Sequence, residues 1–386
     1  MWNDETYPNH NESDMNIKTL SHRSLIIASA LGFALIGFPA SRADDKVAEI
    51  KPDHQSVVVA DAGLWPNLVT LPKGRLLMAG FNQPSHTLKP GDTDCWDSID
   101  GGKTWRLRGT VAKRSDETSN RVHFAVGLTA KGDLLAIAGG MGDAADKTGK
   151  RRLLQPVVTR STDEGKTWET LGDFDAGFEH KYAAIPYGTI STGKDGSLRA
   201  LVYMTTRKDV TAFNDAGNPF AAYMVRSDDD GKTWGKPALV GKDINETTAL
   251  HLGDGEWVAA ARTDERPDPE FGQEVRQYRS TDDGKTWKDE GLLTGYHRHP
   301  AHLLRLKDGR VLLSYGNRKE PGIEVRFSAD KGKTWDKPMR VIGLSAGDLG
   351  YPSSTEREDG RIVTVFYAQT SPLRMGYHAG AVIWKP

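Results

Sequence analysis

Six residues with aromatic, imidazole or carboxylate side chains occupy matching places in a pattern that repeats along the chain. They are Trp65, His123, Tyr187, Glu246, His299 and Tyr351, and each precedes a glycine by nine or ten residues. The neighbouring residues are largely apolar, as in a buried strand, where Val, Ile or Leu would be the ordinary choice. Because ring, imidazole and carboxylate groups together can bind a polar ligand, this set indicates the lining of a pocket.

The glycine that follows each of these residues marks a turn between two strands. Apolar residues precede it and resume after it, as in Gly132-Asp133-Leu134-Leu135. The six glycines are Gly74, Gly132, Gly196, Gly255, Gly309 and Gly360. We therefore predict six strand–turn–strand units, and we expect the starts of their first strands to converge on one central opening.

A second repeat, Ser-Xaa-Asp-Xaa-Gly-Lys-Thr-Trp, follows the first five units. Its copies are Ser98–Trp105, Ser161–Trp168, Ser227–Trp234, Ser280–Trp287 and Ser328–Trp335. The aspartate can accept hydrogen bonds from backbone N–H groups of its own turn, and the glycine tolerates a positive φ. The tryptophan can cover apolar surface. We expect hairpin turns here, in which the aspartates (Asp100, Asp163, Asp229, Asp282 and Asp330) serve the scaffold and not catalysis.

The spacing of this octapeptide predicts the fold. Its copies begin 48 to 66 residues apart, a period typical of four-stranded propeller blades. We predict an all-β, six-bladed β-propeller over residues 44–386. The blades are expected near 64–110, 121–175, 182–240, 245–291, 298–341 and 349–386. The last unit has no octapeptide, so we expect the N-terminal strand Gln55–Ala60 to complete it and close the ring, which leaves no long exposed edge.

Composition excludes several classes of protein. The chain has 386 residues with 51 basic and 52 acidic side chains, which gives a formal net charge of -1. It lacks the clustered basic excess of a nucleic-acid-binding protein. The single cysteine, Cys95, excludes an intramolecular disulfide and a multi-cysteine metal site. Nothing in the sequence indicates a cofactor or a catalytic metal.

Residues 1–43 have the features of an N-terminal extension and signal peptide. Basic residues around Arg23 precede an apolar run, Leu25–Phe38, and small residues follow up to Ala43. This order is typical of a secretory signal, and we expect cleavage after Ala43. The run is shorter than the roughly 20 apolar residues of a membrane span. We therefore expect export to the periplasm or the medium without stable membrane insertion, a retained N-terminal anchor being the alternative.

The octapeptide resembles the Asp box of the sialidase superfamily, over nearly all of the chain that follows the signal segment. The resemblance implies an exo-α-sialidase-like glycosidase that acts on a glycan. By order and spacing, Glu246, Arg262, Arg318 and Tyr351 are similar to the family's glutamate, two carboxylate-binding arginines and nucleophilic tyrosine. A neutral phenol meets less repulsion from a sugar carboxylate than a carboxylate nucleophile does. Because its pKa is about 10, it needs a base such as the glutamate.

The resemblance also implies a general acid in the first blade, and the matching stretch offers Asp92 or Asp94. At one position the chain departs from the family, because Leu64 stands where a third carboxylate-binding arginine is expected. Loss of one charged hydrogen-bond donor costs about 1.5–3 kcal/mol, which weakens binding of a sialic acid. Arg121, beside His123, is a candidate to fill the same space.

Three functions stay open on the sequence alone. The first is a retaining glycosidase that removes terminal acidic sugars through Tyr351 and Glu246. The second is a hydrolase or lyase for uronic-acid-containing polysaccharide, with His123 or His299 as base and Tyr351 as acid. The third is a non-catalytic carbohydrate-binding propeller. In each, Trp65 either stacks on a sugar ring or plugs the central opening.

Overall fold

The structure, a computed structural model, describes the chain from residue 47 onward with short gaps. The described ranges are 47–85, 89–142, 152–178, 184–205, 220–263, 273–345 and 347–386. The chain divides into two units, Met1–Lys46 and Val47–Pro386. The predicted signal peptide and its cleavage after Ala43 lie outside the described residues and stay predictions. Within the described ranges, no helix has the length and apolar character needed to cross a membrane.

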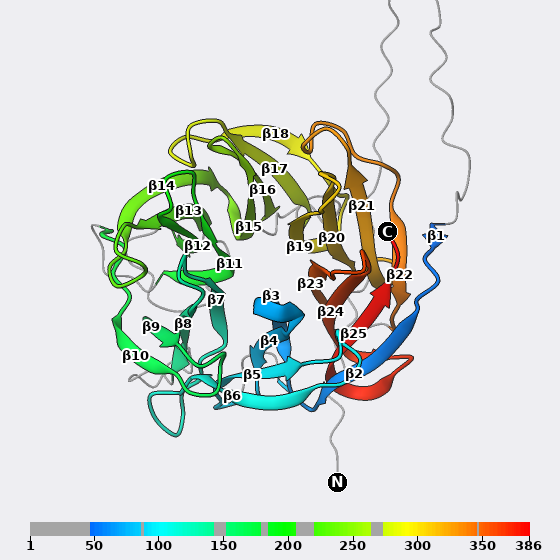
Figure 1. The fold of residues 1–386 in the computed structure, drawn as a ribbon, viewed down its shortest axis with the longest axis horizontal. Coiled ribbons are helices and arrows are strands. Elements are labelled where there is room, and N and C mark those ends of the chain that lie inside the picture. Colours follow the sequence, from blue (N-terminus) through cyan, green and yellow to red (C-terminus); the bar gives the residue numbers. More distant parts are fainter. Residues whose placement is uncertain are drawn as a thin grey trace, which may run out of the picture. The chain divides into compact units, whose positions relative to one another are not determined.

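The described part of Val47–Pro386 is built of β-strands, with one short 3-10 helix at Pro72–Gly74. Hydrogen bonding joins the strands into five sheets that lie around a common axis (Figure 1). The first sheet contains β3 (Leu64–Thr70), β4 (Leu76–Phe81), β5 (Thr93–Ser98) and β6 (Arg106–Ala112). The second contains β7 (His123–Leu128), β8 (Leu134–Gly142), β9 (Arg152–Ser161), β10 (Glu169–Asp173), β11 (Ile185–Thr192), β12 (Leu198–Thr205), β13 (Phe220–Ser227) and β14 (Gly235–Lys242).

Three further sheets complete the arrangement. One contains β15 (Ile244–Gly253), β16 (Glu256–Thr263), β17 (Val275–Ser280) and β18 (Lys288–Leu292). The next contains β19 (Arg298–Arg305), β20 (Val311–Asn317), β21 (Gly322–Ser328) and β22 (Met339–Gly343), with β1 (Ala48–Glu49) added in parallel to β22. The last contains β23 (Leu349–Glu356), β24 (Ile362–Ser371), β25 (Arg374–Trp384) and β2 (His54–Ala60).

The innermost strands form a closed cycle of contacts. Each of β3, β7, β11, β15, β19 and β23 contacts the next, and β23 returns to β3. Each pairs with the following strand in an antiparallel hairpin, so the six predicted strand–turn–strand units are confirmed. The predicted N-terminal closure is confirmed too, because β2 pairs with β25 from His54 to Ala60. This closure covers the outer edge of the last sheet.

The fold is thus all-β and propeller-like as predicted, but the expectation of six separate blades is wrong. There are five sheets, because β7 and β11 pair in parallel and merge their strands into one eight-stranded sheet. Glycine permits this approach. A Cβ on Gly127 would lie 2.1 Å from the carbonyl oxygen of Ile190 on β11, so only a residue without a side chain fits there. The spacing of the octapeptides indicates how many strands each unit contains, but it does not indicate whether strands of neighbouring units pair, as β7 and β11 do.

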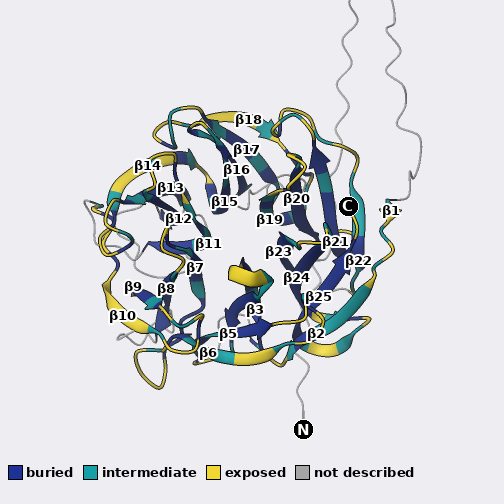
Figure 2. Ribbon diagram, viewed as in Figure 1, coloured by how far each residue is buried: buried dark blue, intermediate teal, exposed yellow. Residues whose placement is uncertain are grey.

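Exposed residues are most frequent in the outermost strands (Figure 2). Every residue of β4, β8 and β20 is buried, whereas every residue of β10 is exposed. Apolar side chains of neighbouring sheets pack between them, such as Leu312 and Phe327 against Phe366 and Trp384. The buried strands fix the positions of the inner strands near the axis. The candidate site lies among these inner strands.

The octapeptides form the turns expected of them. In the second copy, Ser161 and Thr167 donate side-chain hydrogen bonds of 2.8 and 2.7 Å to the carboxylate of Asp163. The Trp168 indole N–H donates to the carbonyl of Gly165. Partial burial acts to raise the pKa of Asp163, but the hydrogen bonds from Thr167 and Ser161 outweigh it and lower the pKa to about 2. The other four copies repeat the serine and threonine hydrogen bonds to their own aspartates, so these carboxylates stabilise hairpins. In the fifth copy, the Trp335 indole donates to the side chain of Gln277 and not to a glycine carbonyl.

Candidate active site

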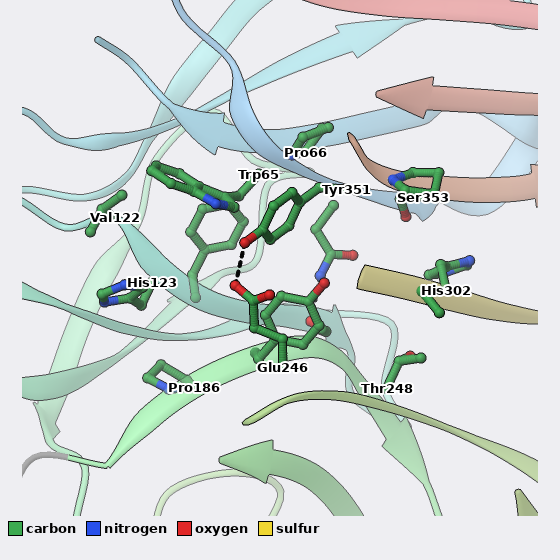
Figure 3. Close-up of a pocket in the computed structure, with 16 residues that line it drawn as sticks. Trp65, Pro66, Val122, His123, Pro186, Glu246, Thr248, His302, Tyr351 and Ser353 are labelled. Carbon is green, nitrogen blue, oxygen red and sulfur yellow. Dashed lines mark hydrogen bonds between the residues drawn. The ribbon is translucent and has the colours of Figure 1, made fainter. Parts of the chain in front are cut away.

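A pocket lies on the central axis, where the inner strands begin (Figure 3). It is lined by Trp65, Pro66, Asn67, Val122, His123, Phe124, Pro186, Tyr187, Gly188, Glu246, Thr248, Ala301, His302, Tyr351, Pro352 and Ser353. All six inner strands, or the residues directly before them, contribute to this lining. Five of the six residues predicted to converge on the axis line the pocket. The exception is His299.

Irregular backbone turns side chains of the inner strands toward this pocket. Five of the six inner strands have a register shift near their start, for example between Leu64 and Asn67 in β3 and between Gly350 and Ser353 in β23. Such bulges re-aim side chains next to functional sites. Trp65 and Tyr351 have φ angles of 53° and 51°, a left-handed conformation that costs bulky residues about 1–3 kcal/mol.

Tyr351 and Glu246 point toward each other across the pocket and are joined by a hydrogen bond (Figure 3). The Tyr351 hydroxyl donates to one carboxylate oxygen of Glu246, and Arg262 Nη1 donates to the other at 2.8 Å. Tyr351 is 5% exposed and Glu246 is 9% exposed. Burial, and then the carboxylate of Glu246, raise the pKa of Tyr351. The phenol is therefore protonated at rest, with an acceptor for its proton already in contact.

Arg318 approaches the same tyrosine from another strand. It follows the last residue of β20, and its guanidinium carbon lies 5.8 Å from the centre of the Tyr351 ring, within the range of a cation–π contact. Its Nη1 also donates to the ring nitrogen Nδ1 of His299 at 2.7 Å and to the carbonyl of His299 at 2.8 Å. The structure thus places Glu246 and Arg318 against Tyr351, with Arg262 against Glu246. Neither arginine is among the residues that line the pocket itself.

An aromatic wall closes the first-sheet side of the site. The Trp65 ring centre lies 6.0 Å from that of Tyr351, edge to face, and 6.1 Å from that of Phe81. Leu64 is fully buried in the same apolar cluster, with Phe81, Val122, Met141, Tyr351 and Tyr367. The space beside Leu64 is therefore filled by apolar side chains.

Comparison with known proteins gives the family of this chain. The family model of the BNR repeat-like domain matches residues 67–364. The chain belongs to this family. A sialidase of Micromonospora viridifaciens is 26% identical over 332 residues, which cover 76% of this chain and 48% of that protein. The chain therefore spans about half the length of this curated relative. Together these matches assign it to the sialidase and BNR-repeat superfamily, and they suggest a glycoside hydrolase.

Solved structures share the same fold. A protein of unknown function from Dyadobacter fermentans superposes with a TM-score of 0.72 and 24% identity, covering 87% of this chain and 99% of that chain. A Hadza microbial sialidase superposes with a TM-score of 0.64 and 20% identity, covering 84% of this chain and 66% of that chain. At these identities the likeness shows the fold alone.

Arg121 does not replace the arginine that this BNR-repeat chain lacks at Leu64, and that prediction is wrong. Its Nη1 donates to the carbonyl of Gln155 at 2.8 Å, and its Nη2 donates to the Ser115 hydroxyl at 3.0 Å. Arg121 is 6% exposed and does not line the pocket. It lies two residues before the start of β7, and its guanidinium turns toward the carbonyls of β8 and β9.

Asp92 and Asp94 lie next to the β4–β5 connection, and neither lines the pocket. The Asp92 carboxylate accepts a hydrogen bond of 2.8 Å from the backbone of Arg114 and pairs with its guanidinium at 3.3 Å. Asp94 accepts a hydrogen bond of 2.9 Å from the Asn82 amide. Burial raises the pKa of Asp94, which favours the protonated form that a general acid needs. The described residues do not bring a carboxylic acid of the first sheet to the pocket.

His299 is displaced from the pocket by the local register of β19. Ten residues separate it from its turn glycine, compared with nine in the other units, and the strand shifts register between Arg298 and Ala301. As a result Ala301 and His302 line the pocket in its place. His299 is 2% exposed and contacts Arg318.

The sequence analysis missed several residues that line the pocket. Asn67, Thr248 and Ser353 each lie two positions after a residue that was predicted. Regular alternation of side chains along a strand would make such residues candidates for the same lining. The register shifts near the starts of β3, β15 and β23 interrupt that alternation, so the sequence alone could not place them. Within the described ranges, no group of three or more His, Cys, Asp or Glu side chains is placed to hold a metal ion.

Proposed function

We propose that this chain is an exported glycoside hydrolase of the sialidase type, which removes a terminal acidic sugar from a glycan. The observation that carries the proposal is the hydrogen bond from the buried Tyr351 hydroxyl to Glu246, with Arg262 on the other carboxylate oxygen. A protonated phenol in contact with a carboxylate is a nucleophile with its base in place. Export rests on the signal-like residues that end at Ala43.

In the first step, the Tyr351 oxygen attacks the anomeric carbon while Glu246 accepts the phenol proton. The bond from the anomeric carbon to the leaving oxygen breaks, and an acid supplies a proton to that oxygen. Water then attacks the anomeric carbon and gives a proton to the conjugate base of that acid, while the bond to Tyr351 breaks and the phenol recovers its proton from Glu246. Two displacements at one carbon retain its configuration.

The arginines have separate tasks in this scheme. Arg262 pairs with Glu246 at 2.8 Å and orients its carboxylate. Arg318 lies over the Tyr351 ring and can bind an anionic group of the sugar, since guanidinium groups match carboxylates through paired hydrogen bonds. Trp65, with its ring edge toward Tyr351, provides an apolar surface for a sugar ring.

A second candidate is a hydrolase or lyase for uronic-acid-containing polysaccharide. The buried Leu64 favours it, because the site has one cation fewer than a sialic-acid site of the family. His123 lines the pocket and could act as the base, with Tyr351 as the acid. His299 does not suit that role, because its ring is hydrogen-bonded to Arg318.

Assays for two kinds of product distinguish these candidate functions. Release of 4-methylumbelliferone from its N-acetylneuraminic acid glycoside, lost in Tyr351→Phe, supports the sialidase-type hydrolase. Absorbance from an unsaturated uronic product supports the lyase. Binding to a glycan array by a protein that turns over no glycan of that array would instead identify a non-catalytic carbohydrate-binding propeller.

A further inference from the structure

The two arginines near Tyr351 differ in what holds them. Arg262 is paired with a carboxylate, Glu246, at 2.8 Å. Arg318 is held by neutral groups, the ring nitrogen Nδ1 and the carbonyl of His299. Among the described residues, no carboxylate lies within ion-pairing distance of Arg318. Within the part of the chain that the structure describes, its positive charge is therefore not neutralised by a carboxylate, whereas that of Arg262 is.

We propose that His299 is a positioning residue, which fixes Arg318 beside Tyr351 without neutralising it and so makes Arg318 the main anchor for an anionic group of the substrate. This proposal rests on the proposed function in one respect, the acidic character of the sugar. His299 acts through Arg318, because its ring contacts that guanidinium and does not line the pocket. Arg318 is not among the lining residues either, but its guanidinium lies over the ring of Tyr351, which is.

The surroundings of His299 fix its protonation. Arg318 offers only N–H donors, and its Nη1 lies 2.7 Å from Nδ1 and 3.3 Å from Nε2 of His299, so the nearer atom, Nδ1, is the acceptor. The proton then resides on Nε2, which lies 3.2 Å from the side-chain oxygen of Gln273 and donates to it. Burial, and then the charges of Arg262 and Arg318, lower the pKa of His299 well below its ordinary value. The ring is therefore a neutral acceptor.

A carboxylate in this place would hold the guanidinium equally well but would cancel its charge. The difference matters for a ligand, because a charge in a buried site acts through a lower dielectric than in water. A neutral imidazole gives the geometry of a fixed arginine and leaves the attraction for an anion intact. In a site where Leu64 replaces one cation, this retained charge is the main source of affinity for an acidic sugar.

The matched variants His299→Asn and His299→Asp test the proposal. Both side chains place an oxygen near the position of Nδ1, and they differ in charge. We expect His299→Asn to retain most of the affinity for N-acetylneuraminic acid and D-glucuronic acid, measured by calorimetry. His299→Asp should weaken binding of whichever acid the wild-type protein binds by about tenfold or more. With the fluorogenic N-acetylneuraminic acid glycoside, the change should appear in KM and much less in kcat.

A purely structural role predicts a different result. Equal losses in His299→Asn and His299→Asp, or unchanged binding in His299→Asp, would overturn the proposal, as would a wild-type protein that binds neither acid. Thermal unfolding of both variants checks that they fold. The wild-type protein could bind the acid without turning over the glycoside, while His299→Asn binds nearly as well and His299→Asp binds more weakly. That result would count against the proposed hydrolase activity and not against the role of His299.

Discussion

The hydroxyl of Tyr351 donates a hydrogen bond to Glu246, a residue 105 positions earlier in the sequence. Tyr351 lies on β23 and Glu246 on β15, two inner strands that are separated around the axis by β19. The contact exists because the strands converge at the axis and because Tyr351 adopts a φ of 51°. Strained backbone at a buried tyrosine is typical of a functional site.

Replacing Tyr351 with phenylalanine should abolish turnover and leave the fold intact. The change removes the attacking oxygen and the hydrogen bond to Glu246, while the ring still packs against Trp65. We expect at least a 10³-fold loss of kcat on a fluorogenic sialoside, on the order of what loss of a nucleophile causes. Steady-state rates and the thermal midpoint together check this. Turnover near the wild-type rate would exclude the phenol as nucleophile.

Restoring an arginine at position 64 should destabilise the protein and not improve binding of acidic sugars. Leu64 is fully buried among Phe81, Val122 and Tyr367, and an unpaired charge in such surroundings costs several kcal/mol. Leu64→Arg should therefore unfold at a clearly lower urea concentration. The control Leu64→Met preserves volume and polarity and should cost less than about 1.5 kcal/mol. A stable Leu64→Arg variant with tighter binding would contradict this expectation.

Arg121 should matter for stability and not for the ligand. Its guanidinium hydrogen-bonds to the carbonyls of Ala138 and Gln155 and to Ser115. Arg121→Met leaves these buried acceptors without their donor, at a cost of roughly 1–3 kcal/mol. Urea unfolding should show the loss, and calorimetry should show an unchanged dissociation constant for acidic sugars. A variant with wild-type stability and weaker binding would mean that Arg121 acts in the site after all.

The octapeptide aspartates should make the protein sensitive to acid. Hydrogen bonds lower the pKa of Asp163 to about 2, below its value of about 3.9 in an unfolded chain. The folded state thus favours the ionised form. The stabilisation is present above about pH 4 and is lost as the pH falls toward 2. We expect the free energy of unfolding to fall steeply across this window.

Asp163→Asn isolates this effect. At neutral pH the variant should lose about 1–3 kcal/mol, because charge-assisted hydrogen bonds are replaced by weaker ones. Its stability should then change less than that of the wild-type protein between pH 4 and about pH 2. Asp254→Asn, in an exposed turn with a φ of 55°, is the matched control and should leave stability nearly unchanged. Urea titrations at several pH values measure both variants.

Much of the fold follows from local sequence signals. The octapeptide contains the donors and acceptors of its own turn, such as Ser161, Asp163 and Thr167, so its sequence predicts its hairpin. Alternation of apolar residues around a glycine likewise predicts a strand pair. The missing sixth octapeptide predicts that Gln55–Ala60 completes the last sheet, and the structure agrees.

Other features depend on residues that are distant in sequence. The merging of two sheets at Gly127 depends on how closely β11 approaches β7. Leu64 was recognised as a departure, but only packing shows that apolar side chains fill the space around it. Spacing along the chain could not show whether Asp92 or Asp94 reaches the pocket as a general acid. The position of each carboxylate depends on its hydrogen-bond partners, which are Arg114 for Asp92 and Asn82 for Asp94.

The strand–turn–strand units, their number and the residue types near the axis can be derived from turn chemistry and strand periodicity, which are local properties of the chain. The partner of each cation cannot be derived in this way: Arg262 contacts a carboxylate, Arg318 a neutral imidazole, and Arg121 backbone carbonyls. The reason is that a long side chain takes its partner from whatever the folded strands bring within its reach, and spacing along the chain does not encode that distance.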